Sequence, residues 1–558
     1  MVTAADARVR PEVQAGKRLS VGRAATLSAV LVCAGTGMGF VRDLLLADHF
    51  GAGPRTDAFL VSWTVPETVS PLLIEDAMAL VMVPVVTRAM LRPHGVPRLV
   101  RRVAPRLILV LTVLAVAVML LAPWLVRIAA PGVTDRAEAV VCLRLTAVTV
   151  LTFGVAGFIS AILRPHHRFG PPAAIYLAYN VGILAMLVTL ANAWGITSAA
   201  LGVACGSLFM VLVQVPAFVR VLRGGSGPAA EAADVPAVPE AEPAPGTAAR
   251  QVWFAAVAPV VAFTVARQAQ VLVERFFGSS LPEGTISHLN YAQKVAQVPM
   301  VLALLVATVT FPRLVRAHLD DDAGRLRRRV EGDLTVVGLL ILVAITYLWT
   351  FAPLITRVMF EHGAFTRADS LSTAHILRIY ALGLLAQCVL GVSVRALSAG
   401  RRGGWRTPLA MLAGLAVTFG VAALFGASHG AGALAAGNAA GISVAAVLQL
   451  VTVRRRVAPI RFVLLGRRLV VGAGCALAAG FGAERVTWLV AGEAAPLVRL
   501  VVGGVAVPLV MTVMLALVIG AAELLRGRDE PETGTGGAGE AGSAPPAERP
   551  PAMRRVIG

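Results

Sequence analysis

Long apolar stretches recur along the whole chain, and they constrain its fold more than any other feature. A helix needs about 20 apolar residues to cross a bilayer, and the 558 residues contain fourteen stretches of that kind. Composition agrees, because 57% of the residues are hydrophobic and only 15% are charged, whereas soluble proteins carry about a quarter charged residues. The sequence therefore predicts an all-α polytopic membrane protein with about 14 transmembrane helices and excludes a soluble globular one.

The basic residues between the predicted spans indicate how the chain crosses the membrane. About 36 of the 50 Lys and Arg residues fall on one side, about 7 on the other and about 7 inside spans. Cytoplasmic loops accumulate Lys and Arg, so we expect both termini on the cytoplasmic side of the membrane. The net charge of +19 is then mostly a matter of topology. Nucleic-acid binding is not expected, since no soluble domain is present to carry a basic patch.

Two stretches rich in Pro, Ala, Gly and Glu interrupt the hydrophobic pattern. They predict a disordered cytoplasmic linker at residues 223–249 and a disordered cytoplasmic tail at residues 526–558. The predicted spans cover residues 24–48, 58–87, 107–130, 140–163, 171–193, 196–219, 251–277, 285–312, 331–355, 371–398, 407–427, 430–453, 469–491 and 496–525. A basic N-terminus, residues 1–23, precedes them.

Four sequence features recur in the same order in the two halves of the chain. They are Phe50-Gly51 and Phe277-Gly278, Pro84 and Pro312, residues 122–127 and 352–357, and Leu143-Arg144 and Leu377-Arg378. Their nearly constant offset predicts two parallel six-helix repeats, an N-lobe at residues 24–222 and a C-lobe at 250–453, followed by two extra helices within 454–525. Transporters built from parallel repeats place the substrate path between the lobes.

Ionisable side chains inside spans are candidates for a functional site, because burying charge in the bilayer is costly. We expect Arg42 to bind an anionic group and Asp43 to orient it or carry a proton. The alternative is an ion pair that only fixes helix packing. Other candidates lie in spans two, seven, eight and ten: Glu75, Arg267, Glu274, Asn290, Lys294, Gln297 and Arg378. Arg378 is close enough to a span end to snorkel instead.

Catalytic and cofactor motifs are not found in the sequence. A Walker A sequence is absent, so the chain is expected to be a transporter and not an enzyme, driven by the membrane potential or a monovalent ion. The five cysteines are scattered singly without CxxC spacing, and the nine histidines show no metal-binding spacing within a span. We therefore expect no cofactor and no metal.

Three ordered runs carry a family resemblance. They are GFVRDLLLADHFGAGPRTDAFLVSW from Gly39, LPEGTISHLNYAQKVAQVPMVLALLVATVTFPRL from Leu281, and VMFEHGAFTRADSLSTAHILRIYALGL from Val358. With them the chain resembles the MurJ/MviN family of lipid II flippases, within the multidrug/oligosaccharidyl-lipid/polysaccharide exporter superfamily. The resemblance implies export of the undecaprenyl-pyrophosphate-linked peptidoglycan precursor lipid II from the inner to the outer leaflet, in cell wall biogenesis.

The resemblance also implies roles for particular residues. Arg42 and Asp43 match the family's functional arginine and aspartate in span one, Asp57 its aspartate after the first external loop, and Lys294 its span-eight arginine. We expect Arg42, Asp43, Lys294 and Arg267 to bind substrate in the cavity.

Asp57, Glu75, Glu274, Asn290, Gln297 and Arg378 are expected to support or gate that cavity. Guanidinium and ammonium groups suit a pyrophosphate.

The chain departs from the family pattern at three positions where cavity cations are typical. Thr36, Ser70 and Pro71 stand there instead. Alternatives therefore remain open: a flippase for another polyprenyl-linked glycan, a drug/cation antiporter of the same superfamily, or a non-transporting scaffold whose linker and tail recruit cell-wall synthesis or division proteins. Membrane lipids are expected to surround the spans in every case.

Overall fold

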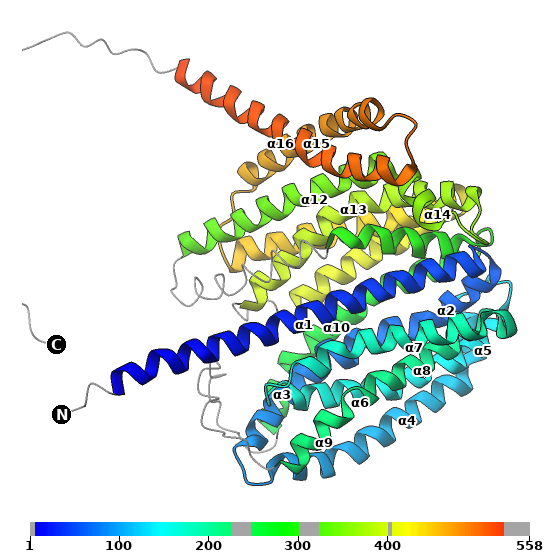
Figure 1. Cartoon of the computed structure of the whole chain (residues 1–558), viewed down its shortest axis with the longest axis vertical. Coiled ribbons are helices and arrows are strands. Elements are labelled where there is room, and N and C mark those ends of the chain that lie inside the picture. The colour runs from blue at the N-terminus through cyan, green and yellow to red at the C-terminus, as the bar shows by residue number, and fades with distance from the viewer. Residues whose placement is uncertain (1–5, 225–246, 301–322, 400–403, 529–558) are drawn as a thin grey trace, which may run out of the picture.

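Helices make up nearly all of the described chain. The computed structural model describes residues 6–224, 247–300, 323–399 and 404–528, and it contains no strand within these ranges (Figure 1). Twelve helices are long and apolar enough to cross a membrane among the residues searched. Helices suit a bilayer because each satisfies its own backbone hydrogen bonds. The predicted all-α polytopic fold is confirmed.

The first six predicted spans form the N-lobe. Span two is the run of α2, a π-helical segment and α3, and α5 with α6 and α8 with α9 likewise make one span each. The helices are α1 (Asp6–Phe50), α2 (Pro54–Ser70), α3 (Ala77–Met90), α4 (Gly95–Ala129), α5 (Arg136–Thr146), α6 (Val148–Leu163), α7 (Gly170–Trp194), α8 (Thr197–Leu212) and α9 (Val215–Arg223).

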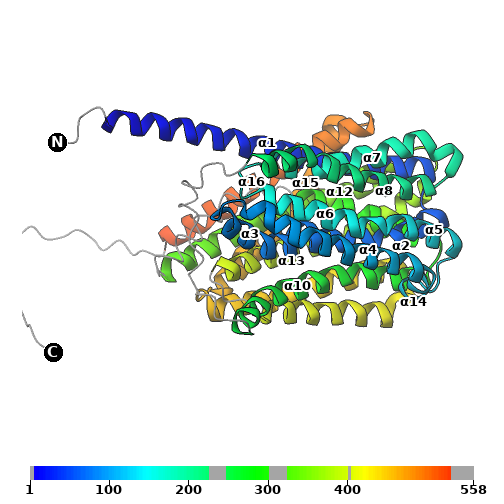
Figure 2. The same ribbon diagram turned by 90° about the horizontal axis from the view of Figure 1, so that it is seen from below.

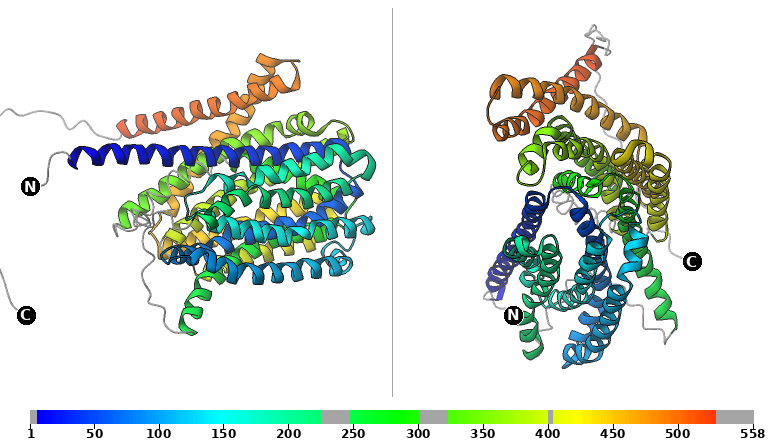
Figure 3. Two further views of the ribbon diagram at one scale, coloured as in Figure 1. Left: turned by 60° about the horizontal axis from the view of Figure 1, so that its bottom comes forward. Right: turned by 90° about the vertical axis from the view of Figure 1, so that its right-hand side faces the viewer.

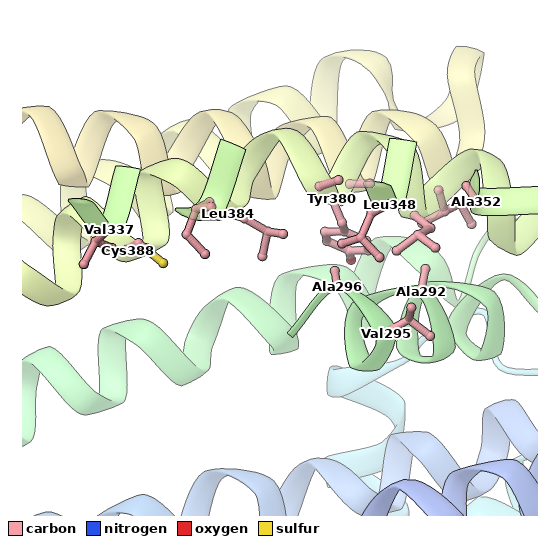
Figure 4. Close-up of a cluster of buried hydrophobic side chains, with 14 of the residues drawn as sticks. Ala292, Val295, Ala296, Val337, Leu348, Ala352, Tyr380, Leu384 and Cys388 are labelled. Carbon is pink, nitrogen blue, oxygen red and sulfur yellow. The ribbon is translucent and has the colours of Figure 1, made fainter. Parts of the chain in front are cut away.

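The C-lobe repeats this arrangement. Its helices are α10 (Thr247–Gly278), a helix over residues 285–300, α12 (Ala323–Phe360), α13 (Arg367–Ala399) and α14 (Arg406–Arg456). Its core is a cluster of apolar side chains between the 285–300 helix, α12 and α13, including Val295, Leu348 and Leu384 (Figure 4). The helices α15 (Phe462–Ala491) and α16 (Pro496–Arg528) pair with each other and pack on α12. Seen along the helix axes, α15 and α16 lie outside the C-lobe (Figure 3, right), and α10 reaches α2, α3 and α4 of the N-lobe.

The recurring sequence features occupy equivalent places in the two lobes. Phe50 ends α1 just as Phe277 lies at the end of α10, and residues 122–127 and 352–357 lie in the last turns of α4 and α12. The structure thus has the predicted parallel repeats. Pro312 and the predicted linker and tail fall largely or wholly outside the described residues.

Three of the fourteen predicted spans cannot be matched one to one with a helix of the structure. The eighth span, residues 285–312, is described only as far as residue 300. The helix α14 joins the predicted spans 407–427 and 430–453 across Gly430, whose φ of 59° favours glycine. The two halves fold back on each other, because Gly414 packs against the backbone of Gly441 and Thr418 against Gly437. These are two antiparallel spans in one element.

Span two changes its helical winding halfway. Residues Pro71–Asp76 form a π-helix between α2 and α3, starting at the proline that stands where the family pattern has a cation. Proline lacks an N–H and cannot continue the regular α-helical ladder, and π-helical turns are frequent at functional sites. The same segment carries Glu75.

The two lobes contact each other at the end of the bundle where α1 ends and α2 begins, and α10 also contacts α2, α3 and α4 along the bundle. We call this end of the bundle the α1–α2 end; the predicted topology places it outside the cell. Here Ala364 in the loop after α12 donates its N–H to the carbonyl oxygen of Asp48 at 2.7 Å, and Gly132 donates to Ser279 Oγ at 3.2 Å. The long helices extend from this end toward the one at which α1 begins (Figure 2).

Candidate functional site

Arg42 and Asp43, adjacent on α1, form a buried ion pair in the N-lobe wall. Arg42 donates from Nε and Nη2 to Asp43 Oδ1 at 2.9 and 2.7 Å, and from Nη1 to Asn180 Oδ1 on α7 at 3.2 Å. Its guanidinium carbon lies 4.4 Å from the ring centroid of Trp63 on α2, a cation–π contact. Arg42 is turned toward these partners and not into an open cavity, so direct anion binding by Arg42 stays a prediction.

Asp57, near the start of α2, caps a helix of the opposite lobe. Its carboxylate accepts hydrogen bonds from Gly284 N, Ser287 N and Ser287 Oγ at 2.8, 2.8 and 2.5 Å. The first N–H groups of a helix lack intrahelical partners, and a carboxylate there also meets the positive end of the helix dipole. Asp57 is buried and joins the lobes at the α1–α2 end.

A cluster of charges joins the lobes deeper in the bundle. We call Glu67 of α2, Arg275 of α10 and Lys294 of the 285–300 helix the interlobe charge cluster. Lys294 Nζ lies 3.1 Å from Glu67 Oε1, and Arg275 Nη2 lies 4.0 Å from Glu67 Oε2. Arg275 also donates to Asn290 Oδ1 and to the carbonyl oxygen of Ile286, each at 3.2 Å. The cluster therefore places cations of the C-lobe against a single N-lobe carboxylate.

Arg267 lies two turns before Glu274 on α10. At about 100° per residue, their separation of seven residues puts the two side chains on nearly the same face of the helix. Arg267 is exposed. Its neighbour Gln268 donates to the backbone carbonyl of Glu67, so this level of α10 borders α2. Arg267 is therefore near the N-lobe, and its place in the cavity stays a prediction.

Glu274 is buried inside the C-lobe. Asn438 on α14 donates to Glu274 Oε1 at 2.5 Å, and one turn away Gln270 donates to Thr418 Oγ1 at 3.2 Å. These contacts join α10 to α14 within one lobe. Glu274 is hydrogen-bonded within the C-lobe, and it lies beside the interlobe charge cluster because it directly precedes Arg275 on the helix.

Glu75 belongs to a polar chain in the N-lobe. Tyr176 on α7 donates to Glu75 Oε1 at 2.6 Å, and its hydroxyl lies 3.2 Å from Ser70 Oγ. Ser70 and Glu75, five residues apart, share this partner across the start of the π-helix. Ser70, which stands where the family pattern has a cation, is therefore linked to Glu75 through the Tyr176 hydroxyl.

The remaining predicted residues are spread through the bundle. Gln297 is half-buried one turn beyond Lys294, and Asn290 is buried against Arg275. Arg378 donates to the backbone carbonyl of Trp349 at 3.0 Å, which ties α13 to α12 away from the cluster. Thr36 is exposed and donates to the carbonyl of Val32 in its own helix.

Sequence reasoning missed Glu67 as a site residue, although its signal was present. An acidic residue follows Pro66 in the middle of a predicted span, and such residues mark functional sites. Trp63 and Asn180 gave no comparable signal, because aromatic and amide side chains occur in many spans without binding charge.

Comparisons with known proteins agree with this architecture. A model of the family described as lipid II flippase MurJ matches residues 46–495. The lipid II flippase MurJ of Burkholderia cenocepacia is 27% identical over 360 residues, which cover 62% of this chain and 67% of that protein. A probable lipid II flippase MurJ of Rhizobium meliloti is 28% identical over 398 residues, covering 68% and 70%.

Solved structures resemble the fold. Lipid II flippase MurJ in an inward closed conformation matches with a TM-score of 0.70 at 18% identity, covering 88% of this chain and 100% of that one. An inward-facing multidrug resistance MATE family transporter of the MOP superfamily matches with a TM-score of 0.58 at 12% identity, covering 81% and 99%. Since the family model spans most of its length, the chain belongs to the lipid II flippase MurJ family.

Proposed function

We propose that this protein moves lipid II from the inner to the outer leaflet of the bacterial plasma membrane by alternating access between its two lobes. The observation that carries the proposal is the interlobe charge cluster, in which Lys294 and Arg275 stand where the lobes meet. Lys294 follows Gly284 by ten residues, or about 15 Å of helix rise. A cationic site at that depth suits an anionic head group crossing a bilayer whose hydrocarbon core is about 30 Å thick.

In this proposal Lys294 and Arg267 hold the pyrophosphate of the substrate. Both belong to the C-lobe. Lys294 contacts Glu67 of the N-lobe, and Arg267 is next to Gln268, which contacts the backbone of the same residue. Ammonium and guanidinium groups form strong charge-assisted hydrogen bonds with phosphate oxygens. Arg42 and Asp43 then have a supporting part: their ion pair, with Trp63 and Asn180, fixes α1 against α2 and α7.

Asp57 serves as the gate at the α1–α2 end. Its carboxylate holds the lobes together by capping the 285–300 helix, so this end is closed in the present structure. Opening toward the outside requires these hydrogen bonds to break. With both termini in the cytoplasm, as the proposal has it, the end that Asp57 closes is the extracellular one.

Coupling to the membrane potential or to a monovalent ion is a further part of the proposal. Glu274 is the suitable residue, because a buried carboxylate between α10 and α14 can hold a proton or a monovalent cation and so change how these helices pack. A carboxylate oxygen is a hard ligand for such ions, and the Asn438 NH2 group that now donates to it would have to turn away.

The test uses a bacterium depleted of its own lipid II flippase. Expression of this chain is expected to restore externally accessible lipid II, and the Lys294→Ala variant is expected to restore little, with Arg378→Ala as the control at equal membrane level. No restoration by the wild-type chain would contradict lipid II as the substrate. Drug resistance without restoration would favour the antiporter, and restored growth without lipid II export would favour the scaffold.

A further inference from the structure

Glu67 occupies the position that an anionic ligand of Lys294 would need. One of its oxygens lies 3.1 Å from Lys294 Nζ, and the other lies 4.0 Å from Arg275 Nη2. That second oxygen is buried and has no hydrogen-bond partner among the described residues. The carboxylate is therefore held mainly by charge, not by a complete set of hydrogen bonds.

The cations around Glu67 differ in how firmly they are fixed. Arg275 is only 3% exposed and also donates to Asn290 and to a backbone carbonyl, so it stays in place without Glu67. The side chain of Lys294 is 21% exposed, and its ammonium group can rotate toward a new acceptor. Removal of the carboxylate would thus leave a preformed pair of cations on one lobe.

We propose that Glu67 is an internal counter-anion that a diphosphate must displace from Lys294, and that this displacement makes the site select diphosphates over singly charged phosphates. This inference rests on the proposed function and adds a selectivity mechanism to it. Glu67 is not among the residues that the sequence or the family resemblance assigned to the cavity.

Charge explains the selectivity. Glu67 against Lys294 and Arg275 leaves one net positive charge in the cluster. A phosphodiester, as in anionic phospholipids, brings a single negative charge and gains little by replacing a carboxylate of equal charge. A diphosphate brings more charge and more acceptor oxygens, and it can bind both cations at once. Membrane phospholipids, which are far more abundant than the substrate, are thereby kept from the site.

Displacement also separates the lobes. The pair between Glu67 and Lys294 is a contact between α2 and the 285–300 helix. In this proposal the pair breaks only when a diphosphate binds Lys294, and one contact between the lobes is then lost. The empty carrier keeps that contact.

The experiment measures binding of two short-chain probes, farnesyl diphosphate and the phosphodiester farnesyl methyl phosphate, to the purified full-length protein in detergent. Glu67→Gln, which keeps the shape and removes the charge, is expected to bind the phosphodiester at least 10-fold more tightly and to lower the diphosphate-to-phosphodiester affinity ratio by a similar factor. Glu361→Gln is the matched control, since it removes a carboxylate that pairs with an arginine of its own lobe, Arg357, and not across the lobes. It should leave the ratio unchanged.

Each outcome is decisive. A wild-type protein that binds the diphosphate, together with a Glu67→Gln ratio equal to wild type, overturns this inference alone. A Glu67→Gln variant that binds both probes more weakly and has a lower melting temperature would show that Glu67 only stabilises the fold. That result also overturns this inference. A wild-type protein that binds neither probe overturns both this inference and the proposed pyrophosphate site.

Discussion

Replacing Asp57 with asparagine should open the α1–α2 end. The carboxylate accepts three hydrogen bonds from the opposite lobe, two of them from backbone N–H groups. An amide keeps one acceptor oxygen and turns an NH2 group toward one of these donors. Hydrogen bonds to charged groups are worth about 1.5–3 kcal/mol each, so losing one shifts the closed-to-open ratio by roughly 10- to 150-fold.

Spin labels on either side of the interface can measure this shift. Arg136 in the N-lobe and Arg367 in the C-lobe are exposed at the α1–α2 end. Both are replaced by spin-labelled cysteines in a protein without the five native cysteines. The distance between the two labels is then measured by pulsed electron paramagnetic resonance. Asp57→Asn should add a longer distance population. The control is Asp135→Asn, which makes the same substitution at a helix cap lying wholly inside the N-lobe. Identical distance distributions for both variants would refute the reasoning.

Two further predictions concern the same gate and the coupling residue. Gly132→Ala should prevent closure, because a Cβ there would overlap the carbonyl oxygen of Ser279 in the other lobe. The same spin labels should then show the longer, open distance. Gly37→Ala is the control and should leave the distance unchanged, because its Cβ meets nothing within 4 Å. Glu274→Gln should abolish the dependence of transport on a monovalent ion or on membrane potential, measured as flux at varied ion gradients. Unchanged ion dependence would remove Glu274 from the coupling proposal.

Much of the fold could be predicted from the sequence, because bilayer thickness dictates span length. The predicted spans 171–193 and 196–219 agree closely with Gly170–Trp194 and Thr197–Arg223, and even the hairpin at Gly430 was predicted as two spans. The π-helix was not predicted, since hydropathy reports which residues face lipid and not how the backbone winds.

The site was harder to predict, because a sequence does not show which charges meet. Adjacent helical residues point about 100° apart, which suggested separate roles for Arg42 and Asp43. The long arginine side chain instead reaches back to its neighbour. Glu67 and Lys294 are separated by 227 residues, and only the packing of one lobe against the other brings them together.

The most direct test of the account is transport by the purified protein. Reconstituted in liposomes, the wild-type chain should translocate fluorescent lipid II without scrambling phosphatidylglycerol, and Lys294→Ala should slow lipid II translocation at least 10-fold while Arg378→Ala does not. Equal translocation by wild type and Lys294→Ala would contradict the proposed site, and no translocation by the wild type would contradict the proposed function.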